Sequence, residues 1–234
     1  MPMDEYRNFY EFSRKVAFSR QDICRKVYED HRQAIRIKKE KTLVKNLMDI
    51  FDAALKISNE KGFQAMTMRK LSKECGLSMG GLYAYFSGKE DLLEMLLSTG
   101  HNTTRQILGE CLAPITGPVS KLRVAIRTHI YLSEAMHPWF YFSYMEARNL
   151  GDTQKERAKA GELETEKLFA DIIEEGRVQG LFKVSDSLLV ASVIKAMVQD
   201  WYVKRWKYAK RAVSVDQYAK LVIEFVEAFC LTQD

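Results

Sequence analysis

The chain has few of the residues that mark several large classes of protein. Only 4 prolines and 12 glycines occur among 234 residues, which excludes collagen-like and loop-dominated chains. No apolar run approaches the roughly 18 residues of a membrane span, because the best candidate, residues 188–198, is interrupted by Lys195. The N-terminus also lacks the apolar stretch of a signal peptide. We therefore predict a cytoplasmic protein that has no membrane partner.

Cysteine and histidine are also scarce. The four cysteines show no C-x-x-C spacing, and the four histidines form no H-x-x-x-H pair, so we expect reduced thiols and no metal site. Neither the G-x-x-x-x-G-K nor the G-x-G-x-x-G phosphate-binding pattern occurs, and we expect no cofactor. The scattered cysteines are Cys24, Cys75, Cys111 and Cys230.

The positive charge is concentrated at the N-terminal end. Residues 1–45 contain 12 Lys/Arg and 7 Asp/Glu, whereas the remaining residues contain 24 of each. Such an excess is a footprint for phosphate, although a solvated basic helix face has the same composition. The basic run is a candidate phosphate or minor-groove arm, formed by Arg36, Lys38, Lys39, Lys41 and Lys45.

Helical signals begin well before the middle of the chain. Residues 1–40 show helical periodicity, and Ser19 followed by Asp22 resembles a capping box for a helix that starts near Arg20. An apolar stripe over residues 43–55 indicates the next helix. We expect that helix to end at Gly62 in the left-handed conformation.

Residues 67–85 carry the pattern of a helix-turn-helix. Thr67 can cap a short helix over 68–74. Gly76 permits a tight turn, after which Ser78 can cap a second helix over 79–85. Two short helices joined by such a turn place the second helix in the DNA major groove.

The rest of the chain also has a helical pattern, with no strand alternation of useful length, and this predicts an all-α fold. Ser87 and Glu90 form a capping box for a helix that continues to Leu97. Ser185 or Asp186 can cap a later helix. The remaining helices are expected near 119–136, 139–149, 154–179, 186–208 and 214–231.

The pattern of residues around this helix-turn-helix resembles the DNA-binding domain of the tetracycline-repressor (TetR) family. The likeness covers residues 43–98 and implies an all-α homodimer with a three-helix N-terminal reader and a larger helical domain that binds a small effector. We therefore expect an N-terminal extension over 1–40, a reader over 41–98 and a regulatory and dimerisation domain over 99–234. The matching residues are Thr67, Met68, Leu71, Gly76, Leu77, Ser78, Gly80, Leu82, Tyr83, Tyr85, Phe86, Lys89, Glu90, Leu92 and Leu93.

The second helix of the pair has residues suited to an approach to DNA. Gly80 and Gly81 let the backbone come close, at a helix-propensity cost of about 1 kcal/mol each, and Met79 suits a thymine methyl. The resemblance implies phosphate contacts at Thr67, Ser78, Tyr83, Tyr85 and Lys89. The full set of predicted DNA-binding residues is Thr67, Arg69, Ser78, Met79, Gly80, Gly81, Tyr83, Tyr85 and Lys89. The predicted reader core is Leu71, Cys75, Leu77, Leu82 and Phe86.

One short motif is also found in enzymes. Residues 76–80 read G-x-S-x-G, the nucleophile-elbow pattern of hydrolases, which requires a preceding strand. The preceding residues 69–74 are polar and of helix type, so we predict no catalytic residues. An enzyme with its site in a C-terminal cavity remains an alternative.

Aromatic residues gather in the second half of the chain. The segment 137–145 is so dense in them that we expect its helix to be buried on more than one side. It either belongs to an ordinary core or lines an effector cavity with apolar walls and a few polar groups. The predicted cavity residues are Met136, His137, Phe140, Tyr141, Tyr144, Met197 and Trp201. Such a cavity favours a hydrophobic effector, an acyl chain or an aromatic compound.

The last two predicted helices are apolar on more than one side. A helix of this kind packs on its own domain and on something else, which predicts a four-helix dimer interface, with a monomeric core as the alternative. The interface candidates are Val190, Val193, Ile194, Met197, Val198, Trp201, Tyr218, Leu221, Val222, Phe225, Val226 and Phe229. The sequence as a whole predicts a ligand-responsive repressor that binds operator DNA as a homodimer, with an activator as the alternative.

Overall fold

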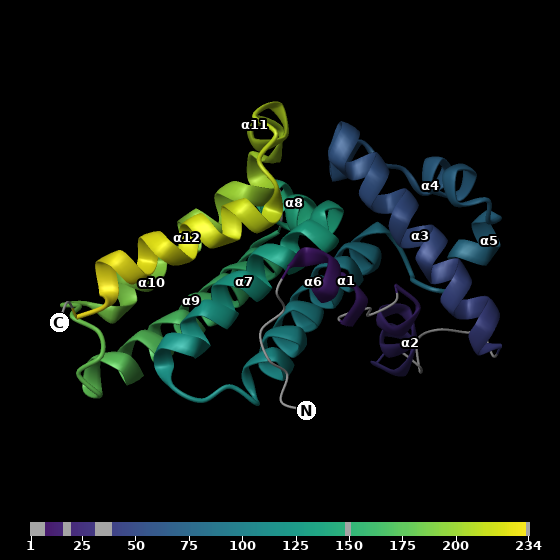
Figure 1. Ribbon diagram of the computed structural model, residues 1–234. Coiled ribbons are helices and arrows are strands. Elements are labelled where there is room, and N and C mark those ends of the chain that lie inside the picture. The colour runs from purple at the N-terminus through teal and green to yellow at the C-terminus, as the bar shows by residue number, and fades with distance from the viewer. Residues whose placement is uncertain (1–7, 16–19, 31–38, 148–150, 233–234) are drawn as a thin grey trace. The chain divides into compact units, whose positions relative to one another are not determined.

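The computed structural model describes residues 8–15, 20–30, 39–147 and 151–232 (Figure 1). Within these ranges the chain forms helices and no strand, so the predicted all-α class is confirmed. None of the described helices is long and apolar enough to cross a membrane. The described residues divide into two compact units: unit 1 contains residues 8–15, 104–137 and 159–232, and unit 2 contains residues 20–30, 39–103, 138–147 and 151–158.

Unit 2 is built around one long helix, α3, whose inward face is apolar at helical spacing. Leu43, Leu47, Ile50 and Ala54 are fully buried on it. The predicted stop at Gly62 is confirmed, but this glycine has φ +81° and ψ 145°, which is outside the left-handed helical region that we expected. The helices of unit 2 are α2 (Arg20–Asp30), α3 (Glu40–Lys61), α4 (Met68–Cys75), α5 (Met79–Leu82), the first part of α6 (Lys89–Leu112), α8 (His137–Glu146) from Pro138, and the start of α9 (Asp152–Val178).

The N-terminal extension contributes α2 to unit 2. Ile23, Cys24 and Val27 are buried on this helix, which packs against α3, and Arg25 Nε donates to Glu40 Oε1 at 2.9 Å. Ser19, proposed as the cap of this helix, lies outside the described residues. α2 therefore enlarges the apolar core around the first reader helix.

Unit 1 is a bundle in which α7 lies against both α10 and α12 (Figure 1). Asp186 caps α10 by accepting from the amides of Leu188 and Leu189, as predicted. The expected helix over 186–208 is divided at Lys204, where the backbone leaves the helical region. The helices of unit 1 are α1 (Phe9–Lys15), the later parts of α6 and α9, α7 (Pro118–Ala135), α10 (Ser187–Val203), α11 (Arg205–Lys210) and α12 (Val215–Cys230).

Helices α10 and α12 run antiparallel and are joined near both ends. At one end the Tyr218 hydroxyl donates to the Met197 carbonyl at 2.6 Å. At the other end the Lys183 amide donates to the Cys230 carbonyl at 2.7 Å. The two hydrogen bonds fix the antiparallel direction of the two helices.

The short helix α1 docks inside unit 1. Phe12 is fully buried and its ring lies 5.4 Å from that of Tyr131 on α7. Both the Phe9 amide, at 2.8 Å, and the Tyr131 hydroxyl, at 2.5 Å, donate to Asp216 Oδ1 at the start of α12. Burial of the phenol, together with the Asp216 carboxylate, raises the pKa of Tyr131. The extension thus supplies a helix to each unit.

Candidate DNA-binding site

The predicted turn between two short helices is present at residues 67–82. The Thr67 hydroxyl accepts from the Lys70 amide at 3.2 Å and so caps α4. Gly76 adopts the left-handed conformation, with φ 70° and ψ 16°. Ser78 accepts from the Gly81 amide at 3.1 Å and caps α5. These caps satisfy helix-end amides that the chain would otherwise leave without partners.

The second helix is shorter than the sequence suggested. We expected it to continue to Tyr85, but α5 ends at Leu82. The Tyr85 amide donates to the Leu82 carbonyl, a bond between residues three apart that tightens the chain into a turn. The capping box for α6 also differs, because Asp91, not Glu90, accepts from the Ser87 amide, at 2.8 Å.

Apolar side chains hold the two helices in place. Leu71, Leu82 and Phe86 are buried, as predicted, whereas Cys75 and Leu77 are only half-buried. The Ser72 hydroxyl donates to the Leu77 carbonyl at 2.5 Å and so fixes the turn from the inside. On the outside, Lys56 of α3 and Glu74 of α4 form an ion pair at 2.6 Å.

The outward side of α5 is exposed to solvent within unit 2. Met79 is 36% exposed and Tyr83 is 46% exposed, and a Cβ built on Gly80 would have no heavy atom within 4 Å apart from its chain neighbours and its own helix backbone. Gly81 differs, because a Cβ there would lie 3.2 Å from the Ser78 hydroxyl. The further exposed residues of the predicted set are Thr67, Arg69 and Ser78.

Two of the predicted phosphate contacts, Tyr85 and Lys89, are less exposed than the others. Tyr85 is 1% exposed, and its burial raises the pKa of the phenol, so in this structure it belongs to the core of unit 2. Lys89 is half-buried; its ammonium donates to the Gln64 carbonyl at 2.9 Å and lies 4.9 Å from the centre of the Phe63 ring. An ammonium has three donors, so Lys89 keeps capacity for a phosphate.

The basic run is described only in part. Arg36 and Lys38 lie outside the described residues. The side chains of Lys39, Lys41 and Lys45 are exposed at the start of α3. They stay candidates for phosphate contacts.

The aromatic helix α8 packs on the helices of unit 2, although its sequence position suggested the regulatory domain. Trp139 Nε1 donates to the Leu96 carbonyl at 3.0 Å, and the Phe142 ring lies 5.9 Å from that of Phe63. Only Trp139, Phe142 and Glu146 are buried on it, at the spacing of one helix face. The expectation of burial on more than one side was therefore wrong.

Sequence reasoning missed Glu146, although a carboxylate in an aromatic segment was a visible signal. Its side chain is 5% exposed and accepts from the Phe63 amide at 2.9 Å, just after Gly62. The bond satisfies a backbone amide that the end of α3 leaves open. Glu146 thereby supports the chain between α3 and α4.

We predict that Glu146→Ala destabilises the protein by about 1–3 kcal/mol, because it leaves a buried amide without an acceptor. Glu146→Gln retains an oxygen at the same place and should lose less. Urea denaturation followed by circular dichroism checks the order of the midpoints. Equal midpoints for the two variants would show that the bond to Phe63 contributes nothing.

The predicted effector residues are divided between the two units. In unit 1, Met136, His137 and Met197 are half-buried and Trp201 is buried. In unit 2, Phe140 and Tyr141 are half-buried and Tyr144 is 47% exposed.

The unit 1 members have polar partners. His137 Nε2 lies 3.1 Å from the Tyr202 carbonyl, and burial lowers the pKa of His137. Trp201 Nε1 donates to Glu134 Oε2 at 3.1 Å. The indole N–H of Trp201 is therefore hydrogen-bonded within unit 1.

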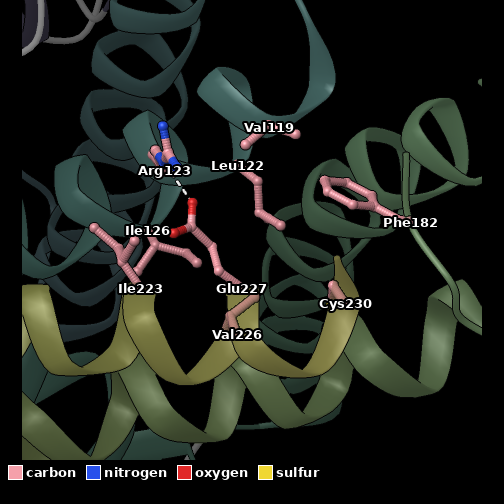
Figure 2. Close-up of a pocket in the computed structure, with 9 residues that line it drawn as sticks. All are labelled: Val119, Leu122, Arg123, Ile126, Phe182, Ile223, Val226, Glu227 and Cys230. Atoms are coloured by element: carbon pink, nitrogen blue, oxygen red, sulfur yellow. Dashed lines mark hydrogen bonds and ion pairs between the residues drawn. The ribbon is translucent and has the colours of Figure 1, made fainter. Parts of the chain in front are cut away.

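A small pocket of unit 1 lies elsewhere, where α7, α12 and the segment before α10 meet (Figure 2). Figure 2 shows Arg123 of α7 and Glu227 of α12 paired at one side of apolar walls. Its volume is about 210 Å³ with open solvent included, and no part admits a water molecule. Ligand pockets usually span about 300–1,000 Å³, so we interpret it as a packing gap. It is lined by Val119, Leu122, Arg123, Ile126, Phe182, Ile223, Val226, Glu227 and Cys230.

Two family models match the chain. "Bacterial regulatory proteins, tetR family" matches residues 50–96, which contain α4, α5 and the turn. "Tetracyclin repressor-like, C-terminal domain" matches residues 116–227. The chain belongs to the TetR family of transcriptional regulators.

Other members of the family are similar over most of this TetR chain. The HTH-type transcriptional regulator HbdR of Aromatoleum sp. (strain CIB) is 23% identical over 180 residues, 77% of this chain and 79% of that one. The ketosteroid transcriptional regulator KstR2 of Mycobacterium tuberculosis has a TM-score of 0.70 at 19% identity, covering 79% of this chain and 94% of its own. AibR, solved with isovaleryl coenzyme A and operator DNA, has a TM-score of 0.67 at 20% identity, covering 79% and 97%. These solved structures establish the TetR fold for the chain.

Proposed function

We propose that this TetR-family regulator is a repressor that binds operator DNA as a homodimer and releases it when a hydrophobic effector binds. The observation that carries the proposal is the outward side of α5, where Gly80 has open space around it and both Met79 and the following Tyr83 are exposed. A recognition helix must bring its backbone close to base edges. A side chain at position 80 would hold it away, whereas glycine lets it enter the groove.

Phosphate contacts would surround this helix. The exposed Thr67 and Ser78 stand at the starts of α4 and α5, and Tyr83 follows α5. Hydroxyls and helix N-termini are common phosphate partners, and they set the position of the protein on the duplex. The proposed contacts are Thr67, Arg69, Ser78, Met79, Gly80, Gly81, Tyr83 and Lys89, with Tyr85 now assigned to the core.

The homodimer is supported by an exposed apolar surface on the last two long helices. Leu189 and Val193 on α10 are more than half exposed, as are Leu221, Phe225 and Phe229 on α12. The inward faces of both helices pack on α7, so these five residues lie on the sides turned away from it. We name them the apolar stripe. Contiguous exposed apolar surface of this kind marks interaction sites, and a two-fold interface would cover the stripe of each subunit with that of the other.

Several residues that were predicted for the dimer interface are buried in the core of their own subunit. Ile194, Val198 and Trp201 of α10 are buried within unit 1, and so are Tyr218, Val222 and Val226 of α12. Val193, Leu221, Phe225 and Phe229 remain available to a partner, and Leu189 joins them. The two helices thus divide their apolar residues between the core and the proposed interface.

The proposed effector is a small molecule with an apolar chain. AibR has been solved with isovaleryl coenzyme A, a short acyl group on a thioester. Within unit 1, the half-buried Met136 and Met197 supply apolar surface. Coupling of about 1–3 kcal/mol between effector and operator is typical of such switches.

Tyr83→Ala tests the DNA assignment. We expect operator affinity to fall at least about tenfold, since a hydrogen bond to a charged group contributes about 1.5–3 kcal/mol. Circular dichroism and light scattering should be unchanged, because Tyr83 is 46% exposed. Fluorescence anisotropy with the DNA upstream of the gene measures the affinity.

The matched control is Tyr10→Ala, which removes a 66% exposed tyrosine from α1 of unit 1. It should leave operator affinity within about twofold of the parent. Equal affinity of parent and Tyr83→Ala would remove Tyr83 from the DNA surface.

A further inference from the structure

Unit 1 contains a buried ammonium in an otherwise apolar helix face. Lys195 of α10 is 6% exposed, and on the same face Ala191 and Val198 are fully buried. Its Nζ lies 3.3 Å from His129 Nε2 of α7 and 3.4 Å from Glu162 Oε2 of α9. A cation therefore lies beneath the surface where three helices of one unit meet.

The charge of Lys195 is balanced only loosely, by the carboxylates of Glu162 and Glu166. Burial lowers the pKa of Lys195, and the carboxylate of Glu162 acts in the opposite direction. The Glu162 side chain is 43% exposed, so solvent weakens the pair. Glu162 also accepts a hydrogen bond from Gln199 Nε2, which holds it at the edge of the cluster.

His129 supplies no charge to this cluster. It is 1% exposed, and its burial, with the nearby ammonium, holds the pKa of His129 well below its usual range. The imidazole is neutral, so its Nε2 can accept from Lys195 while the proton lies on Nδ1. The ring of Phe169 lies 6.3 Å from the imidazole and adds an apolar wall.

This arrangement has the chemistry of a recognition point for an acyl oxygen. Among the described residues, His129 and Glu162 take two of the three N–H donors of Lys195. Apolar walls with one well-placed polar group are the usual design of a small-molecule site.

We propose that Lys195 is the anchor for the acyl oxygen of the effector, and that Glu162 holds the ammonium until the effector enters. The half-exposed Glu162 and Gln199 form the outer side of the cluster, so their displacement opens it toward solvent. The inference rests on the proposed function, because it takes the bound molecule to be the effector.

An acyl oxygen can come from a free fatty acid or from an acyl-coenzyme A. The substitution Glu162→Gln distinguishes the two sources. It removes a negative charge beside the site, so a fatty acid carboxylate should bind at least about fivefold more tightly to it than to the parent. A thioester carbonyl carries no charge, and its affinity should change by less than about twofold.

The experiment measures binding of butyrate, decanoate and palmitate, and of their coenzyme A thioesters, to the full-length protein by isothermal titration calorimetry. Lys195→Met keeps the length of the side chain and removes the ammonium. We expect it to weaken the tightest-binding probe at least about tenfold. Its thermal midpoint should fall, because the substitution leaves the buried His129 Nε2 without its donor, and operator affinity without effector should be unchanged. Lys167→Met is the control, because that lysine lies on α9 with its side chain 70% exposed.

Three results would overturn the proposal. They are unchanged probe affinity in Lys195→Met, an equal loss in Lys167→Met, and a parent that binds none of the six probes. Operator binding by the parent is measured separately in the same preparations. If the parent binds operator but none of the probes, the acyl site is wrong while the DNA-binding regulator stands.

Discussion

Gly80→Leu should abolish high-affinity operator binding while the protein stays folded. The leucine side chain has open space in the free protein, since nothing lies within 4 Å of a Cβ at this position. In the complex the DNA would occupy this space, so the leucine side chain would hold α5 away from the base edges. Base contacts contribute about 1–3 kcal/mol each, and the loss occurs in both subunits of a dimer. We expect affinity to fall at least about a hundredfold, or about 2.7 kcal/mol.

Gly109→Leu is the matched control for this substitution. Gly109 is also an exposed helical glycine with nothing within 4 Å of a Cβ, but it lies in the part of α6 that belongs to unit 1. Replacing glycine inside a helix gains up to about 1 kcal/mol of helix propensity. Both variants should therefore be at least as stable as the parent in thermal unfolding, and only Gly80→Leu should fail in fluorescence anisotropy. Full binding by Gly80→Leu would mean that α5 does not enter the groove.

We expect Phe225→Glu to convert the proposed dimer to a monomer at micromolar concentration. Phe225 is 68% exposed within the subunit, so the change costs its own fold little. In a two-fold interface the new carboxylate would be buried without a counter-ion, and it would occur once in each subunit. Light scattering with size-exclusion chromatography measures the mass. Operator affinity should also fall about a hundredfold or more, because two linked readers bind more tightly than one.

The control for the interface is Leu163→Glu on α9. Leu163 is 61% exposed and lies outside the apolar stripe. It should remain a dimer and bind operator as the parent does. A dimeric Phe225→Glu variant would show that subunits associate through another surface, or that the apolar stripe has a different partner.

The reader could be predicted in detail because its signals are local. Thr67, Gly76 and Ser78 each act within a few residues of themselves, and each has the predicted capping or turn conformation. The errors were local as well: Asp91 took the capping role given to Glu90, and α5 stopped before Tyr85. Neighbouring residues with similar chemistry compete for one amide, and a sequence pattern does not decide between them.

The long-range features could not be predicted in the same way. The partition of apolar residues on α10 and α12 depends on how α7 packs against them, which periodicity alone does not specify. Glu146 and Asp216 accept from the backbones of Phe63 and Phe9, which are far away in the sequence. Lys195 was visible only as an interruption of an apolar run, and its partners His129 and Glu162 come from two other helices.

The most direct test of the account places a photo-crosslinking amino acid at Met79 and irradiates the protein on its operator. Met79 is the first residue of α5 and is 36% exposed, so a probe there points out of the subunit. We predict crosslinks to bases in the major groove at two places about 34 Å apart, one helical turn of duplex. The same probe at Leu163 should give none. Crosslinks from position 163 with none from position 79 would contradict the assignment of α5 as the recognition helix.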